Sequence, residues 1–199
     1  MNTLNQNNIK KITRYVIGEI TELGDELYTN LALSYLNDKN SSTLREAITA
    51  DVCGYEWISE KLGYDAIDTS NNKFKEIKPK LTKLNGVKYS GNGNFSDLNR
   101  KRLIKMISDN SDVVCSLFND SKLVIVFEFK LNQIYEKLNK QVIEKCEKKG
   151  QDHVRSANFS INDVDGDIKV HYYNVNFSNH LTRNMLKKIR DANIPKLFE

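Results

Sequence analysis

Two apolar runs separated by only three polar residues are the most constraining feature of this sequence. Residues 113–118 read Val-Val-Cys-Ser-Leu-Phe, the polar residues are Asn119, Asp120 and Ser121, and the second run covers residues 122–129. Runs of this length, rich in β-branched and aromatic residues and bounded by turn residues, are typical of strands. Because apolar side chains stand on both faces, such strands lie buried inside a sheet. We therefore expect a central sheet that is flanked by helices.

The remaining periodicity predicts helices on both sides of these strands. Expected helices cover about 8–23, 27–37, 43–62, 98–107, 131–149 and 181–190, and further strands cover 64–68, 73–78, 87–90 and 168–175. Thr43 and Glu46 have the spacing of a capping box, and the third helical region is interrupted near Gly54 and stopped at Gly63. Ser96 or Asp97 is expected to cap the fourth helix, over 98–107. The order predicts a mixed α/β fold with helical additions at both termini.

Size and composition describe an ordinary globular chain. Its 199 residues suffice for one good hydrophobic core, and we treat residues 1–199 as a single domain. No apolar run approaches the roughly 20 residues that span a membrane, and the N-terminus lacks the pattern of a secretory signal. Cys53, Cys115 and Cys146 lie far apart, which fits reduced cysteines in a cytoplasmic protein, and the three histidines have no zinc-ligand spacing.

Positive charge is concentrated in one part of the chain. The net charge is only +4, yet residues 73–105 contain ten lysines and arginines against two acids, Glu76 and Asp97. A local field of this sign attracts a polyanion such as a nucleic-acid backbone. The alternative interpretation is a solvated lysine-rich face without a partner.

A predicted β-hairpin carries the acids that suggest chemistry. Its strands flank the turn residues 69–72, and they place Asp65 and Asp68 before the turn and Glu76 and Lys78 after it. If the turn is tight, Asp65 lies across from Glu76, and Lys78 is next on the same face. A register shifted by one residue would bring Asp68 to that face instead. We favour Asp65, since its separation from Glu76 leaves room for a full hairpin.

Carboxylates at this spacing can hold a divalent cation. Asp65 and Glu76 would bind Mg²⁺, for which Mn²⁺ is a substitute, with the Ile77 carbonyl as a further ligand. The ion would polarise a scissile phosphate and lower the pKa of a bound water. Lys78 would orient that water or help to deprotonate it, and would offset charge in the transition state. The competing interpretation is an exposed hairpin with alternating charges.

A second Glu-x-Lys sequence competes with the first. Glu128-Phe129-Lys130 ends the second apolar run, with Asp120 as its candidate partner. Because this strand is apolar on both faces and no basic cluster flanks it, we expect a core strand whose charged end reaches solvent. The hairpin is therefore the preferred site.

In these residues the chain resembles the PD-(D/E)XK nuclease superfamily, to which most type II restriction endonucleases belong. Asp65 matches the first acid and Glu76-Ile77-Lys78 match the (D/E)XK element, while Tyr64 stands where the family has proline. The resemblance covers roughly residues 43–130, including the order of helix, three strands, helix and strand. It implies a restriction-endonuclease-like fold, with that segment as the catalytic core.

The resemblance also implies functional residues outside the hairpin. Members often place a glutamate from the preceding helix near the metal, a role we assign to Glu56, with Glu46 and Glu60 as competitors. Candidates for contact with the DNA backbone are Lys80, Lys83, Arg100, Lys101 and Arg102. The C-terminal Arg183, Lys187, Lys188 and Arg190 form either a second contact surface or a solvated helix face.

The implied activity is Mg²⁺-dependent, sequence-specific cleavage of double-stranded DNA that leaves 5′-phosphate and 3′-hydroxyl ends. A homodimer is the expected way to place two active sites on a two-fold symmetric target. Two alternatives remain open. One is a structure-specific nuclease of DNA repair or recombination with the same fold, and the other is a non-catalytic basic protein that binds nucleic acid.

Overall fold

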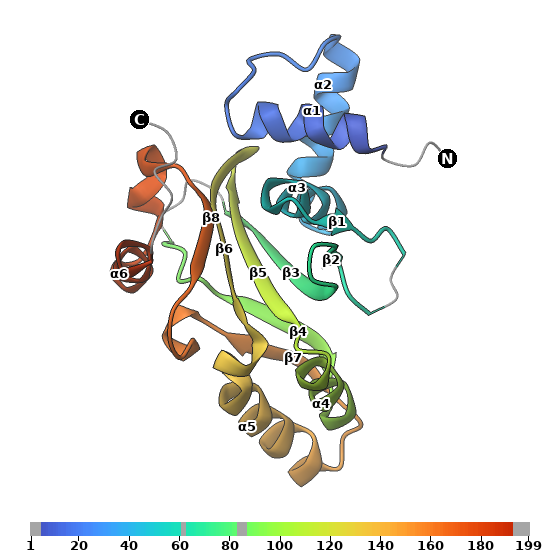
Figure 1. Ribbon diagram of the computed structural model, residues 1–199, viewed down its shortest axis with the longest axis vertical. Coiled ribbons are helices and arrows are strands. Elements are labelled where there is room, and N and C mark those ends of the chain that lie inside the picture. Colours follow the sequence, from blue (N-terminus) through green and yellow to red (C-terminus); the bar gives the residue numbers. More distant parts are fainter. Residues whose placement is uncertain (1–4, 61–62, 83–86, 193–199) are drawn as a thin grey trace.

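Six strands form one mixed sheet in the spatial order β1-β2-β3-β5-β6-β8 (Figure 1). The computed structural model describes residues 5–60, 63–82 and 87–192. The strands of this sheet are β1 (Glu56–Trp57), β2 (Ala66–Asp68), β3 (Lys73–Thr82), β5 (Asp112–Asn119), β6 (Lys122–Lys130) and β8 (Lys169–Tyr173). Neighbouring strands are antiparallel except β3 and β5, which are parallel. The expected mixed α/β fold with a central sheet is therefore confirmed.

The two apolar runs form the middle of the sheet, as predicted. Every residue of β5 is buried, and so is every residue of β6 except those at its two ends. The parallel pairing of β3 with β5 requires a crossover connection, which contains helix α4 (Arg100–Ser108). Burial on both faces explains why neither strand alternates between apolar and polar residues.

Helix α3 (Thr43–Cys53) covers one face of the sheet. It packs on β3, β6 and β8, while α1 (Gln6–Val16) and α2 (Glu26–Leu36) pack on α3 beyond the end of the sheet (Figure 1). Ile48 from α3, Ile77 from β3 and Val114 from β5 belong to the buried cluster between these layers. The N-terminal helices are thus attached to the domain through α3.

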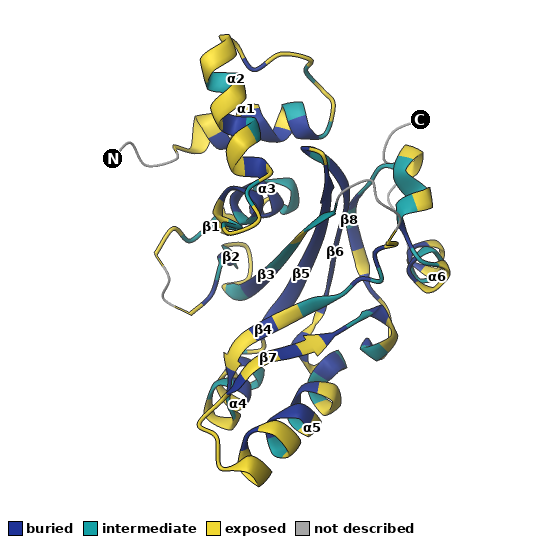
Figure 2. Cartoon of the chain, turned by 180° about the vertical axis from the view of Figure 1, so that it is seen from behind, coloured by how far each residue is buried: buried dark blue, intermediate teal, exposed yellow. Residues whose placement is uncertain are grey.

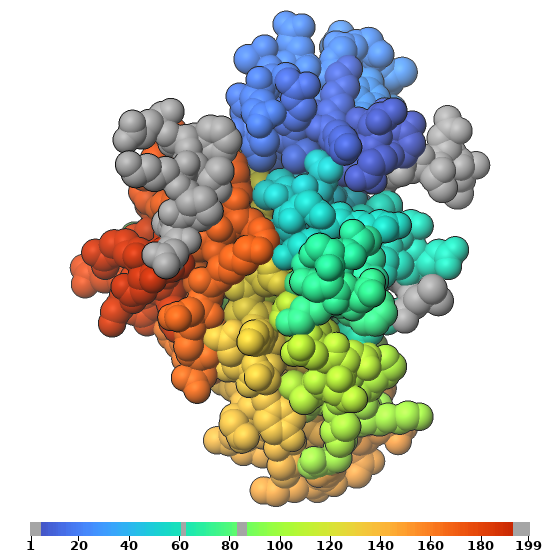
Figure 3. Space-filling view, in the orientation of Figure 1, coloured from blue at the N-terminus to red at the C-terminus, as the bar shows by residue number. Residues whose placement is uncertain are grey.

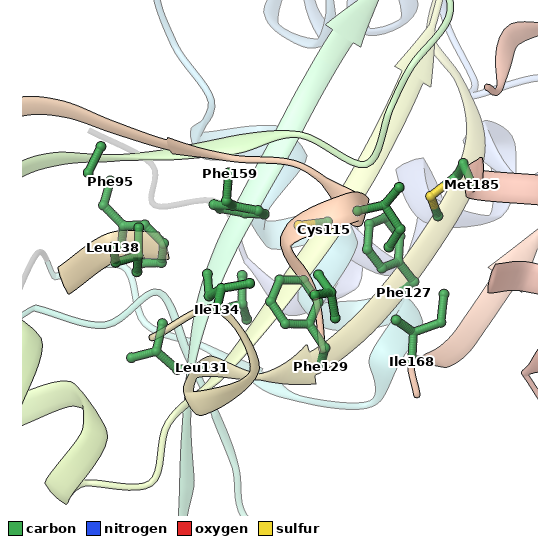
Figure 4. Close-up of a cluster of buried hydrophobic side chains, with 14 of the residues drawn as sticks. Phe95, Cys115, Phe127, Phe129, Leu131, Ile134, Leu138, Phe159, Ile168 and Met185 are labelled. Atoms are coloured by element: carbon green, nitrogen blue, oxygen red, sulfur yellow. The ribbon is translucent and has the colours of Figure 1, made fainter. Parts of the chain in front are cut away.

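The opposite face is covered by a two-stranded ribbon, β4 (Gly93–Leu98) with β7 (Val154–Phe159), and by α4, α5 (Tyr135–Lys145) and α6 (Arg183–Asp191). Figure 4 shows the aromatic centre of this layer, where Phe95 and Phe159 from the ribbon meet Phe127 and Phe129 from β6. Strands β5 and β6 are buried almost throughout, whereas the ribbon strands mix buried and exposed residues (Figure 2). This second layer determines what can approach the face of β3 that is opposite α3.

Two predicted helix boundaries are wrong at glycines. The helix expected over 8–23 ends at Val16, because the chain turns at Gly18 with φ of 88°. The helical region expected to reach residue 62 ends at Cys53, where Gly54 adopts a left-handed conformation with φ of 73°. The following residues form β1. The N-cap is Ser42 rather than Thr43, and its hydroxyl donates to the Glu46 carboxylate.

The segment around residues 87–99 also differs from expectation. Instead of a strand over 87–90 there is one isolated bridge between Tyr89 and Leu181, and strand β4 begins at Gly93, where no strand was expected. Helix α4 is capped by Asn99, whose side chain accepts from the Arg102 N–H, and not by Ser96 or Asp97.

The C-terminal half contains the expected elements with one addition. The helix expected over 131–149 is interrupted, since 3₁₀ turns precede and follow α5 at Leu131–Ile134 and Glu147–Lys149. Strand β7 was not predicted, whereas β8 and α6 fall within their expected ranges to within a residue. None of the helices in the described ranges is long and apolar enough to cross a membrane.

Candidate functional site

The β2–β3 hairpin brings the predicted acids together. The ladder pairs Ala66 with Lys75, and the Asp65 N–H donates to the Lys75 carbonyl at 3.0 Å. The ladder ends at Ala66, and Asp65 lies just before it, close enough for the charge of Glu76 to act on its carboxyl group. Lys78 follows Glu76 on the same face, because side chains alternate along a strand. The predicted register is therefore the one the structure has.

Asp65 occupies a partly buried position immediately before β2. Its Oδ2 accepts a hydrogen bond from the Ile77 N–H at 2.7 Å. Burial, reinforced by the negative charges of Glu76 and Glu46, raises the pKa of Asp65 to about 7, although Lys78 and the Ile77 N–H act in the opposite direction. Because these surroundings disfavour the ionised form of the carboxyl group, a bound cation would stabilise that form strongly.

Glu76 is buried and is held by two cations. Its Oε1 lies 2.6 Å from Lys78 Nζ and 3.3 Å from Arg102 Nη2. Arg102 comes from α4 and also donates to the Ser96 carbonyl of β4 at 2.7 Å. The carboxylate therefore joins β3 to the second layer, and Arg102, which was predicted to contact DNA, lies beside the acid pair.

The ribbon forms a wall beside Lys78. The ammonium group of Lys78 lies 4.9 Å from the ring centroid of Phe95, an aromatic contact that favours a cation. Gly93 passes so close that a Cβ placed there would come within 3.2 Å of the Lys78 Cβ. Lys78 is thus fixed between the acids of the hairpin and the aromatic side of β4.

Tyr64, the residue that precedes Asp65, is held in place by two contacts. Its ring stacks on Phe74 with centroids 4.6 Å apart, and its hydroxyl donates to Asp109 Oδ2 at 2.5 Å. The family pattern has proline at this position, which restricts the backbone by its ring. Here packing and a hydrogen bond restrain the same segment.

The structure favours Glu46 over Glu56 as the helix glutamate. Glu46, in the first turn of α3, contributes to the electrostatic rise in the pKa of Asp65. Glu56 is exposed on β1 and pairs with Ile67, because the helix has already ended at Gly54. Glu60 is exposed in the loop that follows. The expectation that Glu56 lies on the helix is therefore wrong, and of these three glutamates Glu46 is the one on α3 whose charge acts on Asp65.

Asp68 does not belong to the acid pair. It stands opposite Lys73 at the end of the hairpin, on the other face, and its carboxylate accepts from Ser70 and Asn71. The hydrogen bonds from Ser70 lower its pKa. Asp68 therefore stabilises the turn.

The basic residues expected to contact DNA differ in availability. Lys80 and Lys101 are exposed, whereas Arg100 is paired with Glu147 of the 3₁₀ turn after α5. Lys83 lies outside the described residues. Of the other four, two extend from the surface and two are engaged within the protein.

The acid pair fits Mg²⁺ as a partial ligand set. Across the described ranges, no three His, Cys, Asp or Glu side chains are grouped so that they could hold a metal. Mg²⁺, however, keeps several waters and is commonly held by one or two carboxylates. Asp65 and Glu76 supply these, and the Ile77 carbonyl belongs to the residue whose N–H already meets Asp65.

The rival site predicted around Glu128 has a different role. Asp120 lies in the turn between β5 and β6, at the far end of the strand from Glu128, and Lys130 is exposed. Glu128 instead forms an ion pair with Lys75. The Lys75 Nζ lies 2.6 Å from Glu128 Oε1 and 2.7 Å from Asp112 Oδ2. The second Glu-x-Lys is therefore not a copy of the first.

A buried ionic network surrounds Lys75 on the α3 face of the sheet. Besides Lys75, Glu128 binds the Tyr55 hydroxyl and His171 Nε2, each 2.6 Å from its Oε2. Burial alone would raise the pKa of Glu128, but hydrogen bonds from His171, Lys75 and Tyr55 hold it well below its usual range. Sequence reasoning missed this network, because Tyr55, Lys75, Asp112, Glu128 and His171 are widely spaced along the chain.

No protein-family model and no curated protein matches this chain. The functional argument therefore depends on the geometry of the hairpin and its surroundings.

Proposed function

We propose that this protein is a Mg²⁺-dependent endonuclease of the PD-(D/E)XK superfamily that hydrolyses phosphodiester bonds of double-stranded DNA. The observation that carries the proposal is the grouping of Asp65, Glu76 and Lys78 at the β2–β3 hairpin. Asp65 accepts from the Ile77 N–H at 2.7 Å and feels the charge of Glu76, and Lys78 Nζ lies 2.6 Å from Glu76. The topology supports it as well. Helix α3 precedes the β2–β3 hairpin, and helix α4 and strand β5, parallel to β3, follow it in the order that the resemblance implies. The strand between the hairpin and α4 is β4 of the ribbon rather than the expected strand over 87–90.

Each residue of the site has a role in this proposal. Asp65, Glu76 and the Ile77 carbonyl hold Mg²⁺, which when bound polarises the phosphate and lowers the pKa of a water. Lys78, already fixed beside Glu76 and Phe95, orients the attacking water and offsets negative charge on the phosphate. Glu46 adds negative charge behind Asp65 and so strengthens the attraction for the cation.

Digestion of supercoiled plasmid and of a long linear DNA in Mg²⁺ tests the proposal. Glu76→Ala and Lys78→Ala should each lower the cleavage rate at least about a hundredfold, because each removes a group that acts on the reacting phosphate. Duplex binding, measured in Ca²⁺, should persist in both. Glu136→Ala and Lys149→Ala remove the same charges at exposed positions and serve as matched controls.

The fragment pattern identifies the kind of nuclease. Discrete fragments indicate sequence-specific cleavage, whereas cutting confined to junctions or flaps indicates a structure-specific enzyme. If the unaltered protein binds DNA but cuts nothing in Mg²⁺ or Mn²⁺, the nuclease proposal is wrong and the chain is a basic binding protein. Light scattering with and without a duplex tests the homodimer that two-strand cleavage calls for.

A further inference from the structure

Helix α6 presents a basic face that the candidate active site does not use. Met185 and Ile189 are buried against the core, one helical turn apart. Arg183, Lys187 and Arg190 are exposed on the other side, and at 100° per residue they fall within about 60° of one another. The helix is therefore amphipathic, with a row of three cations facing outward.

This helix is firmly attached. Thr182 caps its N-terminus by accepting from the Met185 N–H, and the Asn184 side chain donates to Asn162 at 2.8 Å. Lys188 Nζ donates to the carbonyls of Val164 and Gly166. Lys188 is thus used within the protein and, unlike its neighbours on the helix, is not available to a partner.

The three outward cations differ in their pairing from other basic residues of the chain. Within residues 5–60, 63–82 and 87–192, none of Arg183, Lys187 and Arg190 forms an ion pair, whereas Arg100, Arg102 and Lys105 all do. Two acids, Asp167 and Asp191, line the shallow hollow beside Lys187. An unpaired cationic row on a rigid helix is complementary to a polyanion.

The helix lies on the same sheet face as the acid pair. Met185 packs beside Phe127 of β6, which is two strands from β3 or about 10 Å (Figure 4). In the space-filling view, the hairpin occupies the middle of the molecule and α6 its edge (Figure 3).

A direct backbone connection joins α6 to the wall of the site. Tyr89 exchanges hydrogen bonds with His180 and Thr182, at 2.7 and 3.0 Å, just before α6 begins. Two residues later, Gly91 packs against Met185, and the chain then enters β4, whose Phe95 contacts Lys78. The position of α6 is therefore coupled to the position of Lys78.

We propose that Arg183, Lys187 and Arg190 bind the phosphate backbone of the same DNA duplex on which the hairpin acts. This inference rests on the proposed function in so far as the partner is DNA. Phosphate contacts of this kind fix the register of a duplex on a protein without reading its sequence. Helix α6 would then hold the duplex while the hairpin acts on it.

The test is the salt dependence of duplex binding, measured by fluorescence anisotropy in Ca²⁺ between about 50 and 300 mM salt. The triple variant R183Q/K187Q/R190Q should reduce the slope of log K against log salt by about 2 to 3, because each phosphate that the protein no longer neutralises removes about 0.9. The matched control K10Q/K148Q/K149Q removes three exposed lysines elsewhere and should leave the slope unchanged. Thermal melts establish that both variants fold.

The outcomes separate this inference from the nuclease proposal. An unchanged slope in the α6 variant, with plasmid cleavage intact in the unaltered protein, overturns the role of α6 alone. A reduced slope in a protein that never cleaves supports α6 as a DNA contact and rejects the nuclease. Loss of sedimentation with phosphatidylserine vesicles, without any change in duplex binding, would assign the helix to a lipid surface and overturn the inference.

Discussion

Lys75 Nζ lies 2.6 Å from Glu128 Oε1, and both side chains are buried on the α3 face of the sheet. Its chain neighbour Glu76 projects to the opposite face and forms the acid pair with Asp65. A single strand thus carries a structural ion pair on one side and the candidate catalytic carboxylate on the other. Because the ion pair with Glu128 anchors Lys75, it also fixes the backbone position of the adjacent Glu76.

Replacing Lys75 by methionine should therefore be strongly destabilising. The variant leaves Asp112 and Glu128 buried with fewer counter-charges, a change that costs about 3–5 kcal/mol in comparable sites. Urea denaturation measures this loss. The matched control Lys73→Met removes a more exposed cation 3.5 Å from Asp112, and its effect should be much smaller. Equal stability of the two variants would contradict a structural role for the network.

The hairpin was predictable from the sequence because its information is local. Alternation and the turn residues determine which side chains share a face, so the proximity of Asp65 to Glu76 follows from counting residues. The apolar runs of β5 and β6 were predictable for the same reason. Periodicity and turn chemistry act over a few residues, so these elements can be predicted without knowledge of the tertiary structure.

The helix glutamate and the ionic network depend on tertiary packing. Glu46 and Glu56 look equivalent in the sequence, and only the end of α3 at Gly54 decides which of them approaches Asp65. Lys75 looked like one more cation in a basic segment, because its partners Asp112 and Glu128 lie on strands β5 and β6. Strand β4 was hidden because it begins with Gly93 and Asn94, residue types that disfavour strands when they lack a neighbour such as β7.

The raised pKa of Asp65 predicts that the metal-free protein loses stability as the pH rises. The group has a pKa of about 7 in the folded state and 3.8 ordinarily, so the folded state binds the proton more tightly. Stability from this group is complete below about pH 4 and is lost as the pH passes through 7. The Asp65→Asn variant should not lose stability in this way as the pH rises. At pH 8 in EDTA it should be more stable than the unaltered protein by up to about 4 kcal/mol.

Asp68→Asn is the control with the opposite sign. Hydrogen bonds from Ser70 lower the pKa of Asp68, so its stabilising effect is present above about pH 4 and is lost in acid. The D68N variant should therefore be slightly less stable than the unaltered protein at pH 8. Urea titrations of both variants at pH 4 and pH 8 make the comparison. Equal pH profiles for the D65N variant and the unaltered protein would show that Asp65 is not perturbed by its surroundings.

The choice of Glu46 over Glu56 makes a direct prediction about activity. Glu46→Gln should reduce Mg²⁺-dependent cleavage by about 10- to 100-fold, since it removes negative charge next to the acid pair. Glu56→Gln alters an exposed residue on β1 and should cleave like the unaltered protein. Plasmid nicking rates over a series of Mg²⁺ concentrations distinguish the two variants. A larger effect at Glu56 would restore the assignment made from the sequence.

Close packing at Gly93 predicts that even one methyl group will disturb the site. A Cβ at this position would lie 2.6 Å from the Phe159 Cζ, so the Phe159 ring on the paired strand β7 must shift. It would also lie 3.2 Å from the Lys78 Cβ, so β4 must give slightly against β3. Gly93→Ala should cost about 1–3 kcal/mol of stability by overpacking and should lower the cleavage rate, because Lys78 loses its support from Phe95. Asn94→Ala, at the exposed neighbouring position, should change neither quantity. Full activity in the G93A variant would mean that the position of β4 does not govern Lys78.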